Sequence, residues 1–279
     1  MIPFHIMSRT IEIKELKELK ELAVTVRSDI LNISYEANAS HIGSALSCVE
    51  ILISVYSSLD INAIIKNSDT RDRVILSKGH AAAALYSTLK AFGLITANTL
   101  ASYRKPESVL MGHVSHEVFG VEHSTGALGH GLSVGVGHAI YLKEFSNSAR
   151  VYVICGDGEI QEGSVWEALM LISTRNLNNL VVLIDSNKIS SITDTEKVIN
   201  TGKLEERFKG FGFNVISVNG HDIKEIMKAI DNSNNMTSPT VVVCNTVKGK
   251  GFSFAENSAV WHYKTLTHET LEIALNELK

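Results

Sequence analysis

The chain is 279 residues long, with 44% hydrophobic and 20% charged residues, a composition typical of a folded globular protein. Its formal net charge of −4 provides no basic surface for nucleic acid, which excludes that class of partner. A continuous apolar run of about 18 residues, as a membrane span requires, does not occur, so no membrane insertion is expected.

Helical and strand patterns alternate along the chain. Apolar residues at helical spacing predict helices at the following positions: 11–35, 45–59, 80–92, 131–145, 165–175 and 223–232. Apolar runs predict strands at 73–76, 151–155, 180–185 and 240–245. The last three runs are continuously apolar, which is typical of a parallel sheet buried on both faces. We therefore predict an α/β fold with a doubly wound, mostly parallel sheet flanked by helices.

One domain is expected to span residues 1–279, with a helical extension at its N-terminus. The three cysteines, Cys48, Cys155 and Cys244, form no Cys-x-x-Cys pair, and we interpret them as buried core thiols. An odd and scattered set of cysteines indicates a reducing compartment. Residues 1–20 lack the apolar segment of a signal peptide, so a cytoplasmic location is expected.

Polar residues follow two neighbouring apolar runs. The segment 156–158 (Gly-Asp-Gly) comes directly after one predicted strand, and 185–189 (Asp-Ser-Asn-Lys-Ile) closes the next. In such sheets ligands bind beyond the carboxyl ends of the strands, where these segments become neighbours. Carboxylate and amide oxygens suit Mg²⁺, and glycines let a diphosphate approach the backbone. The pattern predicts a metal and diphosphate site with Asp157 and Asn187 as ligands, while Asp185 is not needed because one contact from each loop suffices.

The longer segments around these residues resemble a known motif. Gly-Asp-Gly-Glu-Ile-Gln-Glu-Gly at 156–163, followed by 185–189, resembles the motif shared by enzymes that use thiamine diphosphate. The resemblance implies that Asp157, the Asn187 side chain and the backbone carbonyl of Ile189 ligate Mg²⁺ and help to bind the cofactor. It also implies further cofactor contacts from three residues: Gly156, Gly158 and Glu162.

Six of the eleven histidines stand in segments that resemble the transketolase family, and four of these six are candidate site residues. These segments are Ala-Ser-His-Ile-Gly at 39–43, the stretch 71–80, Gly-His at 112–113 with 120–131, and 248–251 with 261–262. They occur in family order, and other thiamine enzymes share the metal motif without this set of histidines. In the family the cofactor is the electron sink, and histidines hold and transfer protons at sugar hydroxyls.

The resemblance assigns roles to these four histidines as candidate catalytic residues. It implies that His41 and His262 contact the sugar hydroxyls with His113 nearby, and that His80 bonds the diphosphate. One further segment is implied to lie against the cofactor: Gly126, Ala127 and Leu128.

The chain departs from the family pattern in three places. After His113 it lacks the usual proline and acidic residue, so His116 is an alternative site residue. Tyr263 follows His262 where a small residue is common, which changes access to the site. Gly-His-Gly at 129–131 is closer to split transketolases and to deoxyxylulose-phosphate synthase than to full-length transketolases.

Full-length transketolases have a second domain that supplies a glutamate for the aminopyrimidine ring and basic residues for the sugar phosphate. Only residues 264–279 follow Tyr263, and they are predicted to form one helix. The resemblance therefore implies the cofactor-binding subunit of a two-subunit transketolase that acts on sugar phosphates. Its partner would be a pyrimidine-domain subunit, and the assembly a heterotetramer.

Three alternatives remain at this point. A subunit related to deoxyxylulose-phosphate synthase shares much of the pattern. The α subunit of a 2-oxo acid dehydrogenase is disfavoured by the segment 39–43 and by His80. A non-catalytic relative is disfavoured because Asp157 and Asn187 are both present.

Overall fold

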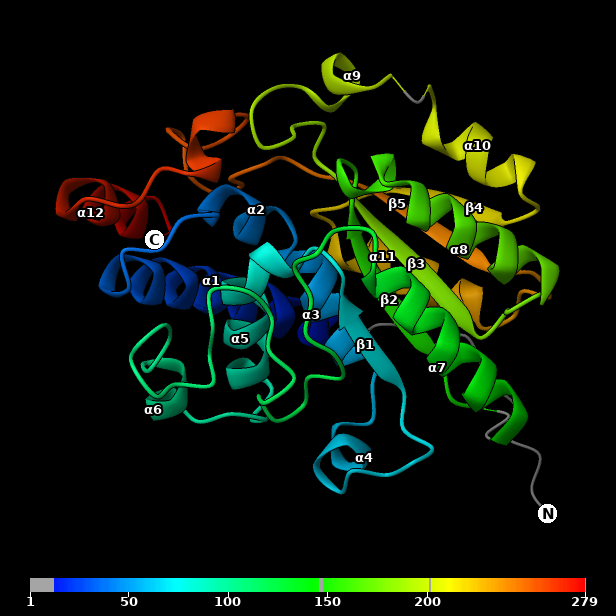
Figure 1. The fold of residues 1–279 in the computed structure, drawn as a ribbon. Coiled ribbons are helices and arrows are strands. Elements are labelled where there is room, and N and C mark those ends of the chain that lie inside the picture. The colour runs from blue at the N-terminus through cyan, green and yellow to red at the C-terminus, as the bar shows by residue number, and fades with distance from the viewer. Residues whose placement is uncertain (1–12, 146–147, 201, 279) are drawn as a thin grey trace.

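The computed structural model describes residues 13–145, 148–200 and 202–278. Among these residues five strands form one sheet in which every neighbouring pair is parallel. The strands lie in this order: β1 (Arg73–Leu76), β2 (Val151–Gly156), β3 (Leu180–Ser186), β5 (Thr240–Asn245) and β4 (Asn214–Asn219). The predicted doubly wound α/β fold is confirmed, since helices cover both faces of the sheet (Figure 1).

The helices form two layers. One face carries α1 (Ile13–Glu36), α3 (Val49–Ser57), α5 (Ala82–Ala91) and α11 (Ile223–Ser233), with α12 (His268–Glu277) packed on α1. The other face carries α7 (Gly131–Phe145), α8 (Gly163–Thr174) and α10 (Leu204–Gly210). The remaining helices are short: α2 (Ile42–Ser47), α4 (Ile61–Ile65), α6 (Ala97–Leu100), α9 (Thr195–Val198), and the 3₁₀ turns η1 (Gly79–Ala81), η2 (Glu159–Gln161) and η3 (Ala259–His262). Within the described ranges, no helix is both long enough and apolar enough to traverse a bilayer.

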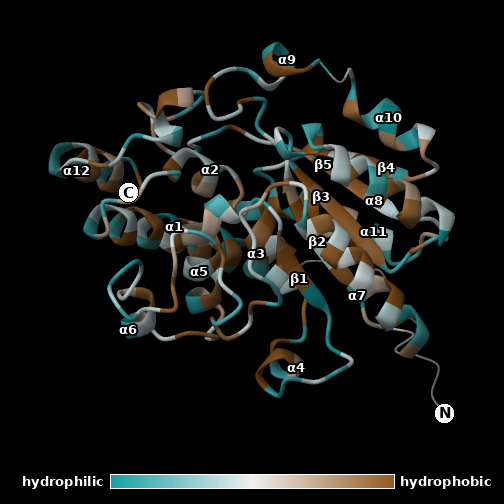
Figure 2. Ribbon diagram, viewed as in Figure 1, coloured by the Kyte–Doolittle hydropathy of each residue, from teal (hydrophilic) through white to brown (hydrophobic). Residues whose placement is uncertain are grey.

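Strand side chains alternate between two hydrophobic cores. Along β2, Tyr152 and Ile154 pack with the α1 side, whereas Val151, Val153 and Cys155 pack with α7 and α8. Because successive strand side chains point to opposite faces, a strand covered on both sides must be apolar throughout. Figure 2 shows this as hydrophobic strands between the two helix layers. The three cysteines are free and buried in these cores.

The structure differs from the sequence prediction at the helix expected over residues 45–59. Two helices, α2 and α3, replace it, and Cys48 lies between them with φ −106° and ψ 13°. The break at Cys48 ends α2 after six residues, and α3 begins at Val49. Residues 11 and 12 of the first predicted helix lie outside the described residues.

Two of the longer elements, β4 and α10, were not predicted. The strand β4 is at the edge of the sheet and pairs only with β5, and most of its side chains are partly or fully exposed. An edge strand of mixed polarity lacks the continuous apolarity that identified the others. The C-terminal helix was predicted, and α12 begins at His268, where Thr267 caps it.

Alanine substitutions at two glycines of α7 are expected to change the free energy of unfolding in opposite directions. A Cβ added at Gly135 would lie 2.5 Å from Val153 Cγ2 in the buried β2, whereas one added at Gly137 has nothing within 4 Å. We expect Gly135→Ala to lower the free energy of unfolding by about 1–3 kcal/mol, because the short Val153 side chain cannot move aside. Gly137→Ala should raise it by roughly 0.5–1 kcal/mol through helix propensity. Urea denaturation measures both, and changes of the same sign would contradict this packing.

Candidate active site

A cavity of about 390 Å³ opens at the carboxyl end of the sheet. The loops that follow β1, β2, β3 and β5 all contribute to it, which is where parallel α/β sheets bind ligands. The chain segment before α2, the loop before α7 and the turn η3 complete the lining. Elements from both ends of the chain therefore meet at one edge of the sheet.

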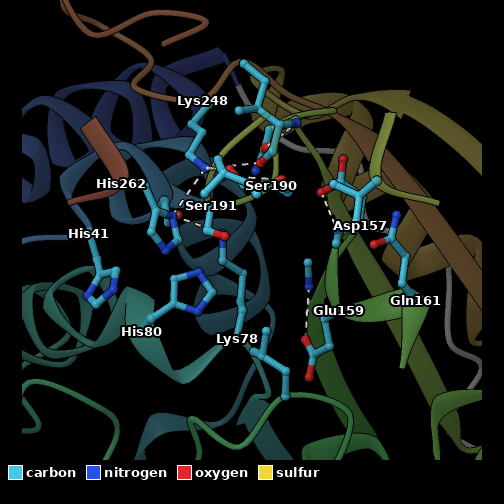
Figure 3. A pocket seen from close by; sticks show the side chains of 18 of the residues that line it. His41, Lys78, His80, Asp157, Glu159, Gln161, Ser190, Ser191, Lys248 and His262 are labelled. Atoms are coloured by element: carbon cyan, nitrogen blue, oxygen red, sulfur yellow. Dashed lines mark hydrogen bonds between the residues drawn. The ribbon is translucent and has the colours of Figure 1, made fainter. Parts of the chain in front are cut away.

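The four histidines that the sequence singled out line this cavity together. The ring centroid of His41 lies 5.5 Å from that of His80, 5.6 Å from His113 and 4.9 Å from His262. Figure 3 shows His41, His80 and His262 gathered on one side of the cavity. The alternative residue, His116, does not line it and instead contacts Ser124 Oγ through Nδ1 at 2.7 Å.

An unusual backbone conformation places the His41 ring. Its φ of 69° and ψ of 15° lie in the left-handed region, which non-glycine residues seldom adopt. The His41 N–H donates to the carbonyl of His262 at 2.9 Å, and the His41 carbonyl accepts from Ser44 and Ala45. Strained backbone of this kind persists where the surroundings hold it, and it is concentrated at functional sites.

Burial keeps the rings of His41, His80 and His262 neutral near pH 7. It lowers the pKa of His41 to about 4, with His113 and Lys248 adding to the effect. It lowers the pKa of His262 to about 3, with Lys248 and His41 adding to it. The pKa of His80 is lowered by burial and by Lys78. A neutral imidazole has one donor and one acceptor nitrogen, so this cluster can exchange hydrogen bonds with hydroxyl groups.

The opposite side of the cavity is built from the loops after β2 and β3. The carboxylate of Asp157 accepts from the backbone N–H of Gly158 at 2.8 Å and of Lys188 at 2.5 Å. The side-chain oxygen of Asn187 accepts from the Ile189 N–H at 3.1 Å. Hydrogen bonds within each loop, and one from Lys188 to Asp157 between the loops, therefore fix the side-chain oxygens that were predicted to be metal ligands. Burial raises the pKa of Asp157 to about 6, and the neighbouring Asp185 adds to this.

Asp185 lies beneath these loops and is fully buried. Its carboxylate pairs with the Lys78 ammonium, and it accepts hydrogen bonds from Ser47, Thr246 and the Asn187 amide. Burial by itself would raise the pKa of Asp185, but Lys78 and the hydrogen bonds outweigh this and lower it. Its oxygens are thus engaged in holding Asn187 and the loops in place.

Lys248 connects the two sides of the cavity; it stands in the segment 248–251 that resembles the family, but no site role was predicted for it. Its ammonium donates to the carbonyls of Ile189 at 3.1 Å and Ser190 at 2.7 Å, and lies 3.3 Å from His262 Nδ1 (Figure 3). Burial lowers the pKa of Lys248 to about 8, and the nearby Lys78 adds to this. Lys248 and Lys78 both line this polar cavity, and neither was predicted to be a site residue.

Glu159 is a second residue that the sequence did not single out. Its buried carboxylate accepts from the backbone N–H groups of Gly129 at 2.9 Å and Gly156 at 3.1 Å, and from Ser77 Oγ. It thereby joins the loops after β1 and β2 to the loop before α7. The only signal in the sequence was its place in the segment after the β2 strand.

The glycines of the cavity allow close approaches. At Gly126 φ is 143°, and an added Cβ would lie 2.7 Å from the His113 ring. Gly126, Leu128, Gly156 and Gly158 line the cavity together with the predicted ligands. Two other predicted cofactor contacts, Ala127 and Glu162, are exposed and are not among its lining residues.

A buried charge network holds the segment after β5 that carries the cavity lysine. Arg27 donates to both oxygens of Glu50 at 2.6 and 2.9 Å and to the carbonyl of Lys250 at 3.2 Å. His221 Nδ1 lies 3.0 Å from Glu50, and its Nε2 accepts from the Val247 N–H at 2.8 Å. Because Nε2 accepts, the proton sits on Nδ1 and donates to the carboxylate. The network fixes the backbone on both sides of the lysine.

We expect this network to make the fold sensitive to acid. Burial by itself raises the pKa of Glu50, but the hydrogen bond with His221 and the ion pair with Arg27 outweigh it and lower the pKa to about 2. A carboxyl group with a lowered folded pKa stabilises the fold above its unfolded pKa and loses that contribution as the pH falls through the folded value. A shift of this size is equivalent to about 3 kcal/mol.

Urea unfolding at a series of pH values between about 5 and 2 measures this dependence. The Glu50→Gln variant keeps the size of the side chain and removes the titrating group. Its stability should therefore be lower at neutral pH and fall less steeply with acid than that of the wild type. Parallel pH profiles for the two proteins would contradict the role assigned to Glu50.

A site of this composition, at the carboxyl edge of a doubly wound sheet, defines the class of thiamine-diphosphate-binding domains. The chain matches the family described as transketolase, thiamine diphosphate binding domain, over residues 19–278, and it belongs to this family. The resemblance found in the sequence is thereby confirmed.

Known relatives include separate subunits and full-length enzymes. The chain is 40% identical over 256 residues to an apulose-4-phosphate transketolase subunit of Phocaeicola vulgatus, covering 90% of each chain. It is 34% identical over 242 residues to a 6-deoxy-6-sulfo-D-fructose transketolase subunit of a Clostridium species, covering 86% of this chain and 88% of that one. The transketolase structure of Campylobacter jejuni superposes with a TM-score of 0.83 at 31% identity, covering 96% of this chain. This chain spans only 43% of that structure.

Proposed function

We propose that this chain is the cofactor-binding subunit of a two-subunit transketolase that transfers a two-carbon ketol unit between sugar phosphates. The observation that carries the proposal is a single cavity lined by Asp157, Asn187, His41, His80 and His262. Metal-ligating oxygens and neutral histidines are the two chemical requirements of such a reaction, and here they face each other. The match to transketolase subunits along nearly the whole chain supports the same proposal.

The residues present fit a divalent cation and a diphosphate. Asp157, Asn187 and the Ile189 carbonyl are hard oxygen donors, which suit Mg²⁺ better than a softer metal. Asp185 is already paired with Lys78, whereas Asp157 is buried with only two backbone N–H donors among the described residues, so a cation would offset the charge of Asp157. Gly158, whose missing side chain leaves its backbone accessible, and the Lys248 ammonium line the cavity beside these oxygens.

Thiamine diphosphate, when bound, supplies the nucleophilic carbon and the electron sink for breaking a carbon–carbon bond. The chain's own residues position the sugar. His41 and His262, held neutral, hydrogen-bond with the sugar hydroxyls and orient them as the bond next to them breaks and forms. His80 lies between them and Lys78, on the diphosphate side, and His113 covers Gly126.

The partner in this proposal is a pyrimidine-domain subunit, and the assembly is a cytoplasmic heterotetramer. The experiment is co-purification of the native partner with the tagged chain, followed by a ketol-transfer assay with thiamine diphosphate and Mg²⁺. Transfer from a ketose phosphate to an aldose phosphate that stops with EDTA is the expected result. A cofactor-loaded complex without transfer from any ketose phosphate would contradict the proposed function.

A further inference from the structure

Tyr263 stands at the opening of the cavity and has no part in the function proposed above. It lines the same cavity as the histidines, and the residue is 62% exposed. Its ring centroid lies 4.8 Å from that of His262 and 6.4 Å from that of His41. Since those two rings are only partly exposed, Tyr263 lies on their solvent side.

The backbone around Tyr263 is held firmly, whereas the side chain is free to meet a ligand. Its N–H donates to the Val260 carbonyl at 3.2 Å, and the preceding His262 carbonyl accepts from His41. Trp261 beside it is buried, with its indole N–H bonded to the Phe254 carbonyl at 2.9 Å. Within the described part of the chain, the Tyr263 hydroxyl has no hydrogen-bond partner.

We propose that Tyr263 is a specificity-determining residue that contacts the part of the sugar beyond the reacting carbons. This inference rests on the proposed function. The histidines act at the reacting end, so the rest of an extended sugar passes toward solvent beside Tyr263. Its ring narrows this passage and offers a flat apolar surface, and its hydroxyl offers a hydrogen bond to a sugar or phosphate oxygen. A tyrosine has few torsions to immobilise, so such contacts discriminate at low entropic cost.

The test compares acceptors of different length in the reconstituted complex with its partner, thiamine diphosphate and Mg²⁺. With one ketose phosphate as donor, kcat/KM is measured for a short aldehyde and for a long aldose phosphate. We expect Tyr263→Ala to change the ratio of the two kcat/KM values by roughly tenfold, the size of one lost hydrogen bond to a charged group. Tyr263→Phe separates the ring from the hydroxyl, because it retains the first and removes the second.

The matched control is Tyr141→Ala, since Tyr141 is also exposed but lies on α7 away from the cavity lining. It should leave the ratio unchanged. Calorimetric titration with thiamine diphosphate should give the same affinity for Tyr263→Ala as for wild type, because Tyr263 lies on the histidine side. If both Tyr263 variants kept wild-type activity and the wild-type ratio of kcat/KM values for the two acceptors, the inference about Tyr263 would be wrong and the proposed function would stand. A wild-type complex without any ketol transfer would overturn the proposed function, and this inference with it.

Discussion

Asp157→Ala is expected to abolish metal-dependent binding of thiamine diphosphate and to leave the chain folded. The residue combines a carboxylate with a place at the end of β2, and it is one of two side chains assigned to the metal. Even residues that only support metal ligands change affinity by about 10- to 100-fold, so loss of a ligand should cost at least about 100-fold. Calorimetric titration of thiamine diphosphate in the presence of Mg²⁺ measures this directly.

The fold should tolerate this change because Asp157 is held by backbone contacts alone. Its carboxylate accepts from two N–H groups and forms no ion pair within the described residues. Burial raises its pKa to about 6, so the charged form is less stable here than in water. Removing two such hydrogen bonds costs about 1–3 kcal/mol, a fraction of the stability of a domain of this size.

Two controls separate a lost ligand from a damaged fold. Asp231→Ala removes a carboxylate from α11, outside the cavity lining, and should bind the cofactor as the wild type does. Thermal unfolding followed by circular dichroism should remain cooperative in both variants. Wild-type affinity in Asp157→Ala would contradict the assignment of the metal site, whereas a chain that no longer melts cooperatively would contradict the expected tolerance.

Much of the fold could be predicted because its central strands are apolar on both faces. The runs that became β2, β3 and β5 indicated a parallel sheet by this property alone. The edge strand β4 is half-exposed and gave no such pattern. The separation of α2 from α3 at Cys48 was also not predictable, because apolar spacing continues through the break.

The candidate site also has a part that the sequence could predict and a part that it could not. Asp157 and Asn187 could be predicted as candidate ligands because they directly follow recognisable strands, and the parallel topology makes those strand ends neighbours. Lys78 and Lys248 were not predicted as site residues, since the role of a lysine depends on the groups around it in the folded chain. Lys78 pairs with Asp185, more than a hundred positions away, and no local pattern connects the two. Buried charges that act through distant partners are the part of a site that spacing cannot predict.

The largest expected effect concerns the chain without its partner. We expect the isolated chain to bind thiamine diphosphate and Mg²⁺ but to show no measurable ketol transfer. Among the described residues that line the cavity, the carboxylates are Asp157 and Glu159. The first is assigned to the metal, and the second accepts three hydrogen bonds from Ser77, Gly129 and Gly156. Neither is free to hydrogen-bond the aminopyrimidine ring.

The physical reason is that an open half-site leaves the pyrimidine end of the cofactor in water. Hydrogen bonds that direct charge in a transition state are effective when they are preorganised and shielded from solvent. A missing acid–base contact costs roughly 10²- to 10⁴-fold in rate, and loss of shielding adds to it. Steady-state transfer by the purified chain with and without the pyrimidine-domain partner measures the difference, while calorimetry establishes that cofactor is bound in both. If the isolated chain turned over at the rate of the complex, the carboxylate would have to come from this chain, and the proposal of two cooperating subunits would be wrong.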